Sequence, residues 1–314
     1  MTHFADRLGE AVDVKGNPCV VGLDPKLESI PTPLRNEVIG GAPLTCESAA
    51  ELIRVFCREV VDIVAPRVPV AKVQSAFFER FGPAGYQAYA DTVAYAKSKG
   101  LIVIADVKRS DIGSTAEAYA EGHLGVASVE GVELFDLGAD ACTVNPYFGS
   151  DGVVPFIDQA VRRDRGVFVL VRTTNPSAGR IQNLSCKGVP LFTRIGALVH
   201  DWGKDYVGRR GYSCVGAVVG GTQPLDAEKL RRLMPRAYFL VPGYGAQGAG
   251  RVEVAKSFDA RGRGAIVSSS RAVIFAHNRS PYDRQFGAAR WREAVAAALE
   301  AMITDIRATA GMLP

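Results

Sequence analysis

The amino-acid sequence predicts a (β/α)8 barrel in a single domain spanning residues 1–314, and three observations support this fold class. Eight short apolar segments alternate along the chain with longer segments of helical periodicity. Within the short segments the apolar residues follow one another almost without interruption, as expected for parallel strands buried on both faces. The chain has 314 residues, of which 47% are hydrophobic, which is enough for one large barrel core. A doubly wound open sheet is the competing architecture.

The elements can be assigned in order along the chain. Phe4, Leu8 and then Ala11 or Val12 recur at helical spacing among acidic residues, which indicates an amphipathic N-terminal helix rather than a secretory signal. The strands expected after it are Pro18–Asp24, Val68–Gln74, Leu101–Lys108, Ala139–Asn145, Gly166–Arg172, Cys214–Gly220, Ala237–Pro242 and Gly264–Ser269. The helices expected between and after them are Glu47–Ala65, Ala84–Lys99, Thr115–Glu130, Val153–Arg163, Leu191–Val207, Ala227–Met234, Ala249–Asp259 and Arg290–Thr309.

Composition excludes several classes of partner. The formal net charge is only +4 and no Lys/Arg-rich block is present, so we expect neither a nucleic-acid nor a membrane partner. No segment approaches the roughly 18 consecutive apolar residues that a spanning helix needs. Six scattered cysteines form no Cys-x-x-Cys pair, and the four histidines are dispersed, so we expect free thiols, no metal site and a cytoplasmic protein.

Polar residues at the ends of the predicted strands are the most informative part of the sequence. The active site of a barrel of this class lies where the strands end at their carboxyl termini. The polar residues and the glycine expected there are Asp24, Lys72, Asp106, Lys108, Asn145, Arg172, Gly243 and Arg271. Three long connections also follow strands and are expected to border the same site, namely Lys26–Thr45, Thr173–Gly188 and Ala272–Gly287.

A charged constellation follows the third predicted strand. Asp106 and Lys108 are two residues apart, so in a strand they share one face, above an apolar barrel interior. A buried ion pair that plugs the barrel is one interpretation. Lys72 at the end of the neighbouring strand and Asp111 just beyond this one favour a second interpretation. Two lysines and two aspartates within reach of one pocket can destabilise a substrate carboxylate, stabilise a carbanion and deliver a proton, which suits decarboxylation without a cofactor.

Four sequence motifs carry a resemblance to a known family. They are Asp106-x-Lys108-x-x-Asp111-Ile112 with Lys72 upstream, the loop Pro242–Gly248 (PGYGAQG), Ser268–Arg271 (SSSR) and Gly22–Pro25 (GLDP). In their order along the chain and in their barrel-like spacing, these motifs resemble the orotidine 5′-monophosphate decarboxylase family over almost the whole chain. The overall length and the segment Arg172–Ala178 (RTTNPSA) are similar to the longer bacterial branch of that family.

The resemblance implies a role for each catalytic residue. Lys108 would donate a proton to C6 of the pyrimidine, and Asp106 would face the leaving carboxylate. Lys72 would contact the ribose and order the charges. Asp111 would complete the array and, with Thr115, would reach the active site of a partner subunit. The resemblance therefore implies a homodimer with shared active sites.

It also implies how the substrate, orotidine 5′-monophosphate, is bound. Asp24 would bind a ribose hydroxyl, and Thr174, where many members have serine, would bind the pyrimidine through its retained hydroxyl. The 5′-phosphate would be held by side chains and backbone amides of two segments, through Gln247, Arg271, Gly243 and Gly245. No cofactor is implied.

Two alternatives to this function stay open from the residues alone. A metal-dependent phosphosugar lyase or synthase of the same barrel group would use the Asp-x-Lys motif with acidic magnesium ligands, and it would need a further acid where this chain has Lys72. A non-catalytic nucleotide-binding barrel would be expected to lack at least one charge of the array.

Overall fold

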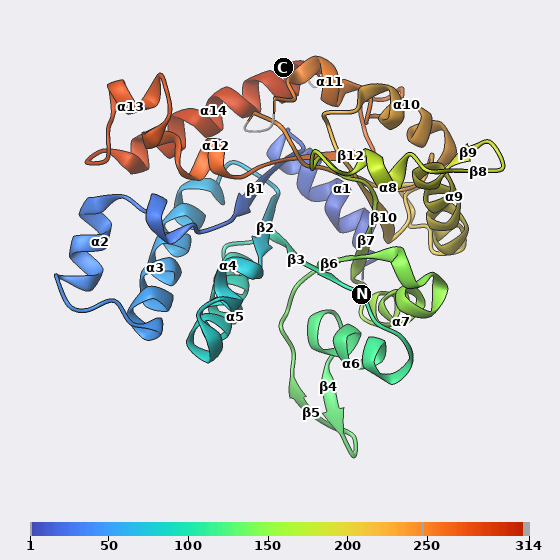
Figure 1. Ribbon diagram of the computed structural model, residues 1–314, viewed down its shortest axis with the longest axis horizontal. Helices are drawn as coiled ribbons and strands as arrows, with labels where there is room; N and C mark the ends of the chain where they lie inside the picture. Colours follow the sequence, from blue (N-terminus) through green and yellow to red (C-terminus); the bar gives the residue numbers. More distant parts are fainter. Residues whose placement is uncertain (1, 246–247, 310–314) are drawn as a thin grey trace.

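Eight parallel strands close into a barrel in which β1 pairs with both β2 and β12 (Figure 1). The computed structural model describes residues 2–245 and 248–309. The barrel strands, in their order around the barrel, are β1 (Cys19–Leu23), β2 (Val70–Gln74), β3 (Ile102–Arg109), β6 (Ala141–Val144), β7 (Gly166–Arg172), β10 (Val215–Val219), β11 (Phe239–Val241) and β12 (Ala265–Ser269). All eight predicted strands are confirmed, and closure rules out the open sheet.

Helices surround the barrel. The longer ones are α1 (Phe4–Lys15), α3 (Cys46–Val64), α5 (Gly82–Ser98), α6 (Gly113–His123), α7 (Ser150–Arg162), α9 (Leu191–Gly203), α10 (Pro224–Leu233) and α14 (Trp291–Thr309). They confirm the predicted helices with small shifts at the ends, except that α9 stops four residues early, at Gly203, and α6 ends well before the predicted Glu130. The predicted helix Ala249–Asp259 is reduced to α11 (Arg251–Ala255). Among the described residues, no helix has both the length and the apolar character needed to cross a membrane.

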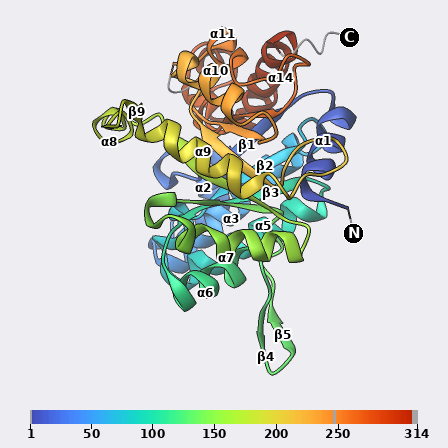
Figure 2. The same ribbon diagram turned by 90° about the vertical axis from the view of Figure 1, so that its right-hand side faces the viewer.

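The prediction of one helix over Thr115–Glu130 was wrong in its second half. Helix α6 ends at His123, and an antiparallel hairpin of β4 (Ala127–Val129) and β5 (Val132–Phe135) follows it. Glu130 and Gly131 form its turn with φ of 52° and 81°, the left-handed pair that joins two-residue hairpins. The β-branched residues on both sides of this turn favour strands over helix. Figure 2 shows the hairpin projecting from the body of the molecule.

The long connections contain short elements that the sequence analysis did not predict. The first holds η1 (Leu27–Ser29) and α2 (Thr32–Ile39), and α4 (Ala76–Glu79) follows β2. The remaining short elements along the chain are η2 (Pro146–Phe148), α8 (Gly179–Gln182), β8 (Ser185–Cys186), β9 (Val189–Pro190), α12 (Arg271–Ile274), η3 (Ala276–Asn278) and α13 (Tyr282–Gln285).

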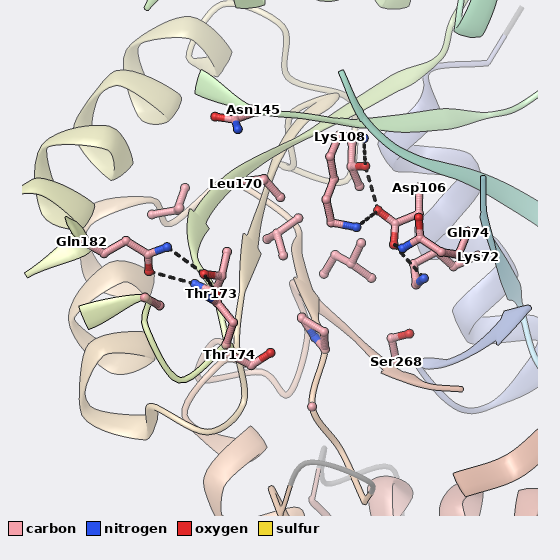
Figure 3. A pocket seen from close by; sticks show the side chains of 18 of the residues that line it. Lys72, Gln74, Asp106, Lys108, Asn145, Leu170, Thr173, Thr174, Gln182 and Ser268 are labelled. Carbon is pink, nitrogen blue, oxygen red and sulfur yellow. Dashed lines mark hydrogen bonds and ion pairs between the residues drawn. The ribbon is translucent and has the colours of Figure 1, made fainter. Parts of the chain in front are cut away.

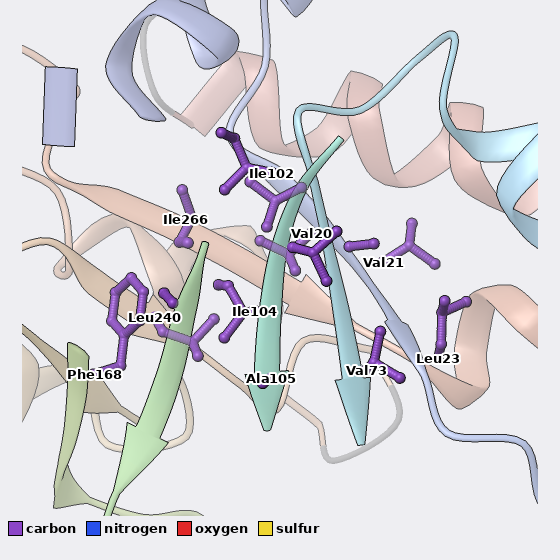
Figure 4. Close-up of a cluster of buried hydrophobic side chains, with 14 of the residues drawn as sticks. Val20, Val21, Leu23, Val73, Ile102, Ile104, Ala105, Phe168, Leu240 and Ile266 are labelled. Carbon is purple, nitrogen blue, oxygen red and sulfur yellow. The ribbon is translucent and has the colours of Figure 1, made fainter. Parts of the chain in front are cut away.

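Apolar side chains fill the barrel below the ends of its strands (Figure 4). Ile104, Phe168 and Ile266 are fully buried, and Leu240 is almost fully buried. On β3, the alternation of side chains places Ile102 and Ile104 on the same face as Asp106, which comes next toward the carboxyl end. The first charged group of the site therefore sits directly on the apolar core.

Candidate active site

A cavity of about 640 Å³ opens where the barrel strands end. Charged residues line one side of it, the connection after β7 lines another, and apolar side chains of β7, β10 and β11 form its floor (Figure 3). The lining residues predicted from the sequence are Asp24, Lys72, Asp106, Lys108, Asn145, Thr174, Gly243 and Arg271. The apolar floor consists of Leu170, Val218 and Leu240.

The carboxylate of Asp106 is the centre of the charged side. Its Oδ2 accepts hydrogen bonds from Lys72 Nζ at 2.7 Å and from Gln74 Nε2 at 2.9 Å. Its Oδ1 accepts from Lys108 Nζ at 2.5 Å and from Thr143 Oγ1 at 2.8 Å. Each carboxylate oxygen thus has one cationic and one neutral donor. Asp24 extends the array, with its Oδ1 3.5 Å from Lys72 Nζ.

Charge pairing outweighs burial in this array. Burial alone would raise the pKa of Asp106, but the positive charges of Lys72 and Lys108 and their hydrogen bonds hold that pKa well below its usual range. Burial likewise opposes the charged form of Lys72, yet the carboxylates of Asp106 and Asp24 raise the pKa of this lysine above its usual range. Asp106 is therefore ionised and Lys72 protonated throughout the neutral range.

Two donors to Asp106 were missing from the sequence-based site, Gln74 and Thr143. Gln74 lies directly opposite Asp106 in the pairing of β2 with β3, and it shares a face with Lys72 two residues earlier. The two-residue spacing between Lys72 and Gln74 could therefore have identified Gln74 as a site residue from the sequence. Thr143 lies inside the buried strand β6, and no charge or glycine marks it in the sequence.

The end of β3 is not a regular strand. The pairing of β3 with β6 shifts register between Ala105 and Arg109, and Lys108 adopts φ of 47°. A left-handed backbone at a residue other than glycine costs roughly 1–3 kcal/mol and is held in place by its surroundings. Asp106 and Lys108 do meet, as expected from their spacing, but through a bulge rather than through simple alternation.

The connection after β7 supplies one wall of the cavity. Thr174 lines the cavity, and Gln182 of α8 braces the neighbouring residue by accepting from the Thr173 amide at 3.1 Å and donating to its hydroxyl at 2.7 Å. Arg172, also at a strand end, turns away and binds Asp226 at 2.9 Å. It is therefore a structural residue rather than a lining one.

The far end of the cavity carries the residues expected to hold a phosphate. Arg271 begins α12, lines the cavity and is exposed. Gly243 also lines it, with φ of 102°, whereas Gly245 lies behind the lining and donates its amide to the carbonyl of Ala249 at 2.9 Å. Gln247, also predicted here, lies outside the described residues.

Two predicted residues, Asp111 and Thr115, do not line the cavity of their own chain. The Oδ1 atom of Asp111 accepts from the amide of Ile112, and Thr115 is exposed on α6. The expectation that both aspartates and both lysines share one pocket was therefore wrong within a single chain, because Asp111 lies two residues beyond the end of β3 and is not among the lining residues. Of the three long connections, Thr173–Gly188 borders the cavity throughout its first half, whereas Lys26–Thr45 and Ala272–Gly287 supply no described lining residue.

Fold and site together define a (β/α)8-barrel enzyme whose cavity holds a buried carboxylate between two ammonium groups. The family model described as orotidine 5′-phosphate decarboxylase / HUMPS family matches residues 20–281. The chain belongs to this family, which confirms the resemblance of its motifs.

Individual relatives agree with the family model along the whole chain. An orotidine 5′-phosphate decarboxylase of Rhodopirellula baltica is 43% identical over 298 residues, covering 95% of this chain and 97% of the relative. One of Caldicellulosiruptor bescii is 38% identical over 278 residues, covering 88% and 91%. The solved structure of the OMP decarboxylase of Leishmania donovani superimposes with a TM-score of 0.73, at 26% identity and 99% coverage of both chains.

Proposed function

We propose that this protein decarboxylates orotidine 5′-monophosphate to uridine 5′-monophosphate and CO2, without a cofactor, as the last step of UMP biosynthesis. The observation that carries the proposal is the Asp106 carboxylate held between Lys72 and Lys108 at the mouth of the barrel. Full-length relatives at 43% and 38% identity that bear this enzyme's name support it.

The proposed chemistry uses the charges of this array. The substrate carboxylate is placed beside the ionised Asp106, so that repulsion is relieved as the C6–carboxylate bond breaks and CO2 leaves. The electron pair of that bond stays on C6, where the ammonium group of Lys108 stabilises it. Lys108 Nζ then donates a proton to C6, which completes uridine 5′-monophosphate.

Substrate binding is proposed to involve three parts of the cavity. Asp24 and Lys72 bind the ribose, and Thr174 binds the pyrimidine through its hydroxyl. Arg271 binds the 5′-phosphate with its forked, permanently charged donors. Gln247 and the backbone at Gly243 and Gly245 complete the phosphate site.

The test is turnover by the purified protein with EDTA present. Formation of uridine 5′-monophosphate under these conditions supports the proposal, and no turnover contradicts it. Turnover restored only by magnesium would favour the metal-dependent phosphosugar alternative. That alternative needs an acid at the end of β2, where Lys72 places an ammonium group 2.7 Å from Asp106.

Loss of the phosphate arginine is expected to weaken binding more than chemistry. In Arg271→Ala the exposed side chain is removed without leaving a buried cavity, so the barrel stays folded. The KM for orotidine 5′-monophosphate should rise by at least about 10-fold, since a charge-assisted bidentate contact is worth roughly 1.5–3 kcal/mol. Steady-state kinetics check this, with the exposed Arg279→Ala as the matched control. An unchanged KM would show that the phosphate lies elsewhere.

We also propose that the active form is a homodimer with shared sites, to which Asp111 and Thr115 of each chain contribute across the interface. Their positions outside their own chain's cavity support this.

Lys72→Ala and Asp111→Ala proteins should each be inactive. Mixed in equal amounts, they should recover about a quarter of wild-type activity, since half of the dimers are mixed and each of these has one intact site. No recovery after subunit exchange is verified by mass spectrometry would contradict shared sites.

We further propose that residues 1–314 act as one catalytic domain in the cytoplasm. The continuous barrel supports the first part, since its strands come from β1 to β12 along the chain. The six cysteines support the second, because all are free thiols and four of them are buried.

A further inference from the structure

We infer that Thr143 is a positioning residue for the decarboxylation, because its hydroxyl group ties the carboxylate of Asp106 to the backbone of Lys108. The inference rests on the proposed function for its catalytic consequence. The contacts that support it belong to the pairing of β3 with β6.

The register shift places Thr143 alone against the catalytic segment. Ala105 pairs with Cys142 and Arg109 pairs with Val144. Three residues of β3, from Asp106 to Lys108, therefore lie opposite the single residue Thr143. Any side-chain contact that holds this bulge from β6 between those pairs has to come from Thr143.

The hydroxyl group of Thr143 makes two hydrogen bonds, one in each direction. It accepts from the backbone amide of Lys108 at 2.9 Å, and it donates to Oδ1 of Asp106 at 2.8 Å. A hydroxyl has one proton to donate, so this proton is committed to Asp106. Thr143 is 1% exposed, so bulk water does not compete for either bond.

These bonds hold the part of the site that is under backbone strain. Lys108 has φ of 47°, and its amide proton is held only if an acceptor lies where Thr143 Oγ1 lies. Without that acceptor the amide of Lys108 would lose its partner, and the chain around Lys108 could relax toward a regular strand. The Cα atom of Lys108 would then shift, and its side chain would reach the cavity from a different position.

Thr143 also matters because Lys108 has to move. Its Nζ shares Oδ1 of Asp106 with the Thr143 hydroxyl, and its side chain is 44% exposed. When Lys108 turns its ammonium group toward C6, Oδ1 loses one donor and keeps the other. The carboxylate therefore stays in the orientation that faces the substrate.

Gln74 does not duplicate this role. It donates to Oδ2, the oxygen that Lys72 already holds, and that pair is buried and fixed. Its amide makes no hydrogen bond with the backbone of Lys108. Thr143 is thus the residue that joins the two catalytic groups through one atom.

The experiment compares Thr143→Val, Thr143→Ser and Thr92→Val. Valine keeps the shape and removes the hydroxyl, serine restores the hydroxyl, and Thr92→Val removes another buried hydroxyl, which donates to the Ala88 carbonyl in α5 at 2.7 Å, far from the site. For Thr143→Val we expect kcat for orotidine 5′-monophosphate to fall roughly 10- to 100-fold with little change in KM, as for a misplaced catalytic group. Serine should restore most of kcat, and Thr92→Val should leave it unchanged.

Hydrogen exchange gives a readout that does not need turnover. In Thr143→Val the peptide containing Lys108 should exchange its amide protons faster, and in Thr143→Ser and Thr92→Val it should not. Wild-type kcat together with unchanged exchange in Thr143→Val would overturn the inference, and so would equal kcat losses in the valine and serine variants. Absence of turnover in the wild-type protein would instead overturn the proposed function, and the exchange comparison would still decide whether Thr143 holds the Lys108 backbone.

Discussion

Replacing Lys108 by alanine is expected to remove nearly all turnover while the barrel remains folded. The side chain is 44% exposed and leaves no buried cavity, and the pair between Asp106 and Lys72 persists. The variant loses the proposed proton donor and also the positive charge that is proposed to stabilise the carbanion. General-acid catalysis and electrostatic stabilisation each contribute roughly 10²-fold or more, so kcat should fall by at least about 10⁴-fold.

A matched control for this variant exists within the chain. Lys187 is also an exposed lysine with a left-handed backbone, at φ of 51°, and it does not line the cavity. Lys187→Ala should retain wild-type kcat, measured by the loss of substrate absorbance. Near-normal turnover in Lys108→Ala would show that the proton comes from another group.

Asp106→Asn is expected to cost both turnover and stability. Asparagine has nearly the same shape but no charge, so the side chain of Lys72, only 8% exposed, keeps just the more distant carboxylate of Asp24 at 3.5 Å. Breaking a buried pair in this way typically costs about 3–5 kcal/mol of the free energy of unfolding. Urea denaturation at pH 7 measures it. The exposed pair of Asp62 and Lys99 provides the control, since Asp62→Asn should cost less than about 1 kcal/mol.

The pH dependence of that difference follows from the two pKa shifts. The pKa of Asp106 is lowered on folding, so its stabilisation is complete above the unfolded value of about 4 and is lost as the pH falls toward the folded value. The pKa of Lys72 is raised, so its stabilisation is complete below about 10.4 and is lost as the pH rises. The difference between wild type and Asp106→Asn should therefore be flat from about pH 4 to 10 and shrink outside it. A difference that grows below pH 4 would contradict the paired carboxylate.

The barrel was predictable because its strands carry a strong local signal. Segments such as Gly166–Arg172 are apolar up to their last residue, which is expected for burial on both faces, and the structure has β7 over the same range. The helix predicted through Glu130 failed because the apolar residues after His123 fit either period, and the Glu130–Gly131 turn decides between them. The short helices of the long connections depend on packing against the barrel, which local periodicity does not record.

The site was predictable where a charge follows a buried strand. Lys72 and Asp106 are conspicuous for that reason, and their meeting follows from neighbouring parallel strands. Thr143 was not predictable, because its importance depends on the register between β3 and β6 and on a bulge. No glycine or proline in the sequence indicates that bulge. Asp111 was predicted as a site residue, but it does not line the cavity of its own chain. Nearness to Lys108 in sequence does not bring the side chain of Asp111 into the same cavity, since β3 ends at Arg109, two residues before it.

The left-handed backbone of Lys108 also bears on how this enzyme can be engineered. Glycine adopts such a conformation at little cost, whereas lysine does not, so the fold by itself would prefer glycine there. A stabilisation campaign guided by backbone geometry alone would select this position among its first substitutions and would delete the cation that we propose as the proton donor. Residue 108 is thus a point where thermostability and activity select for different amino acids.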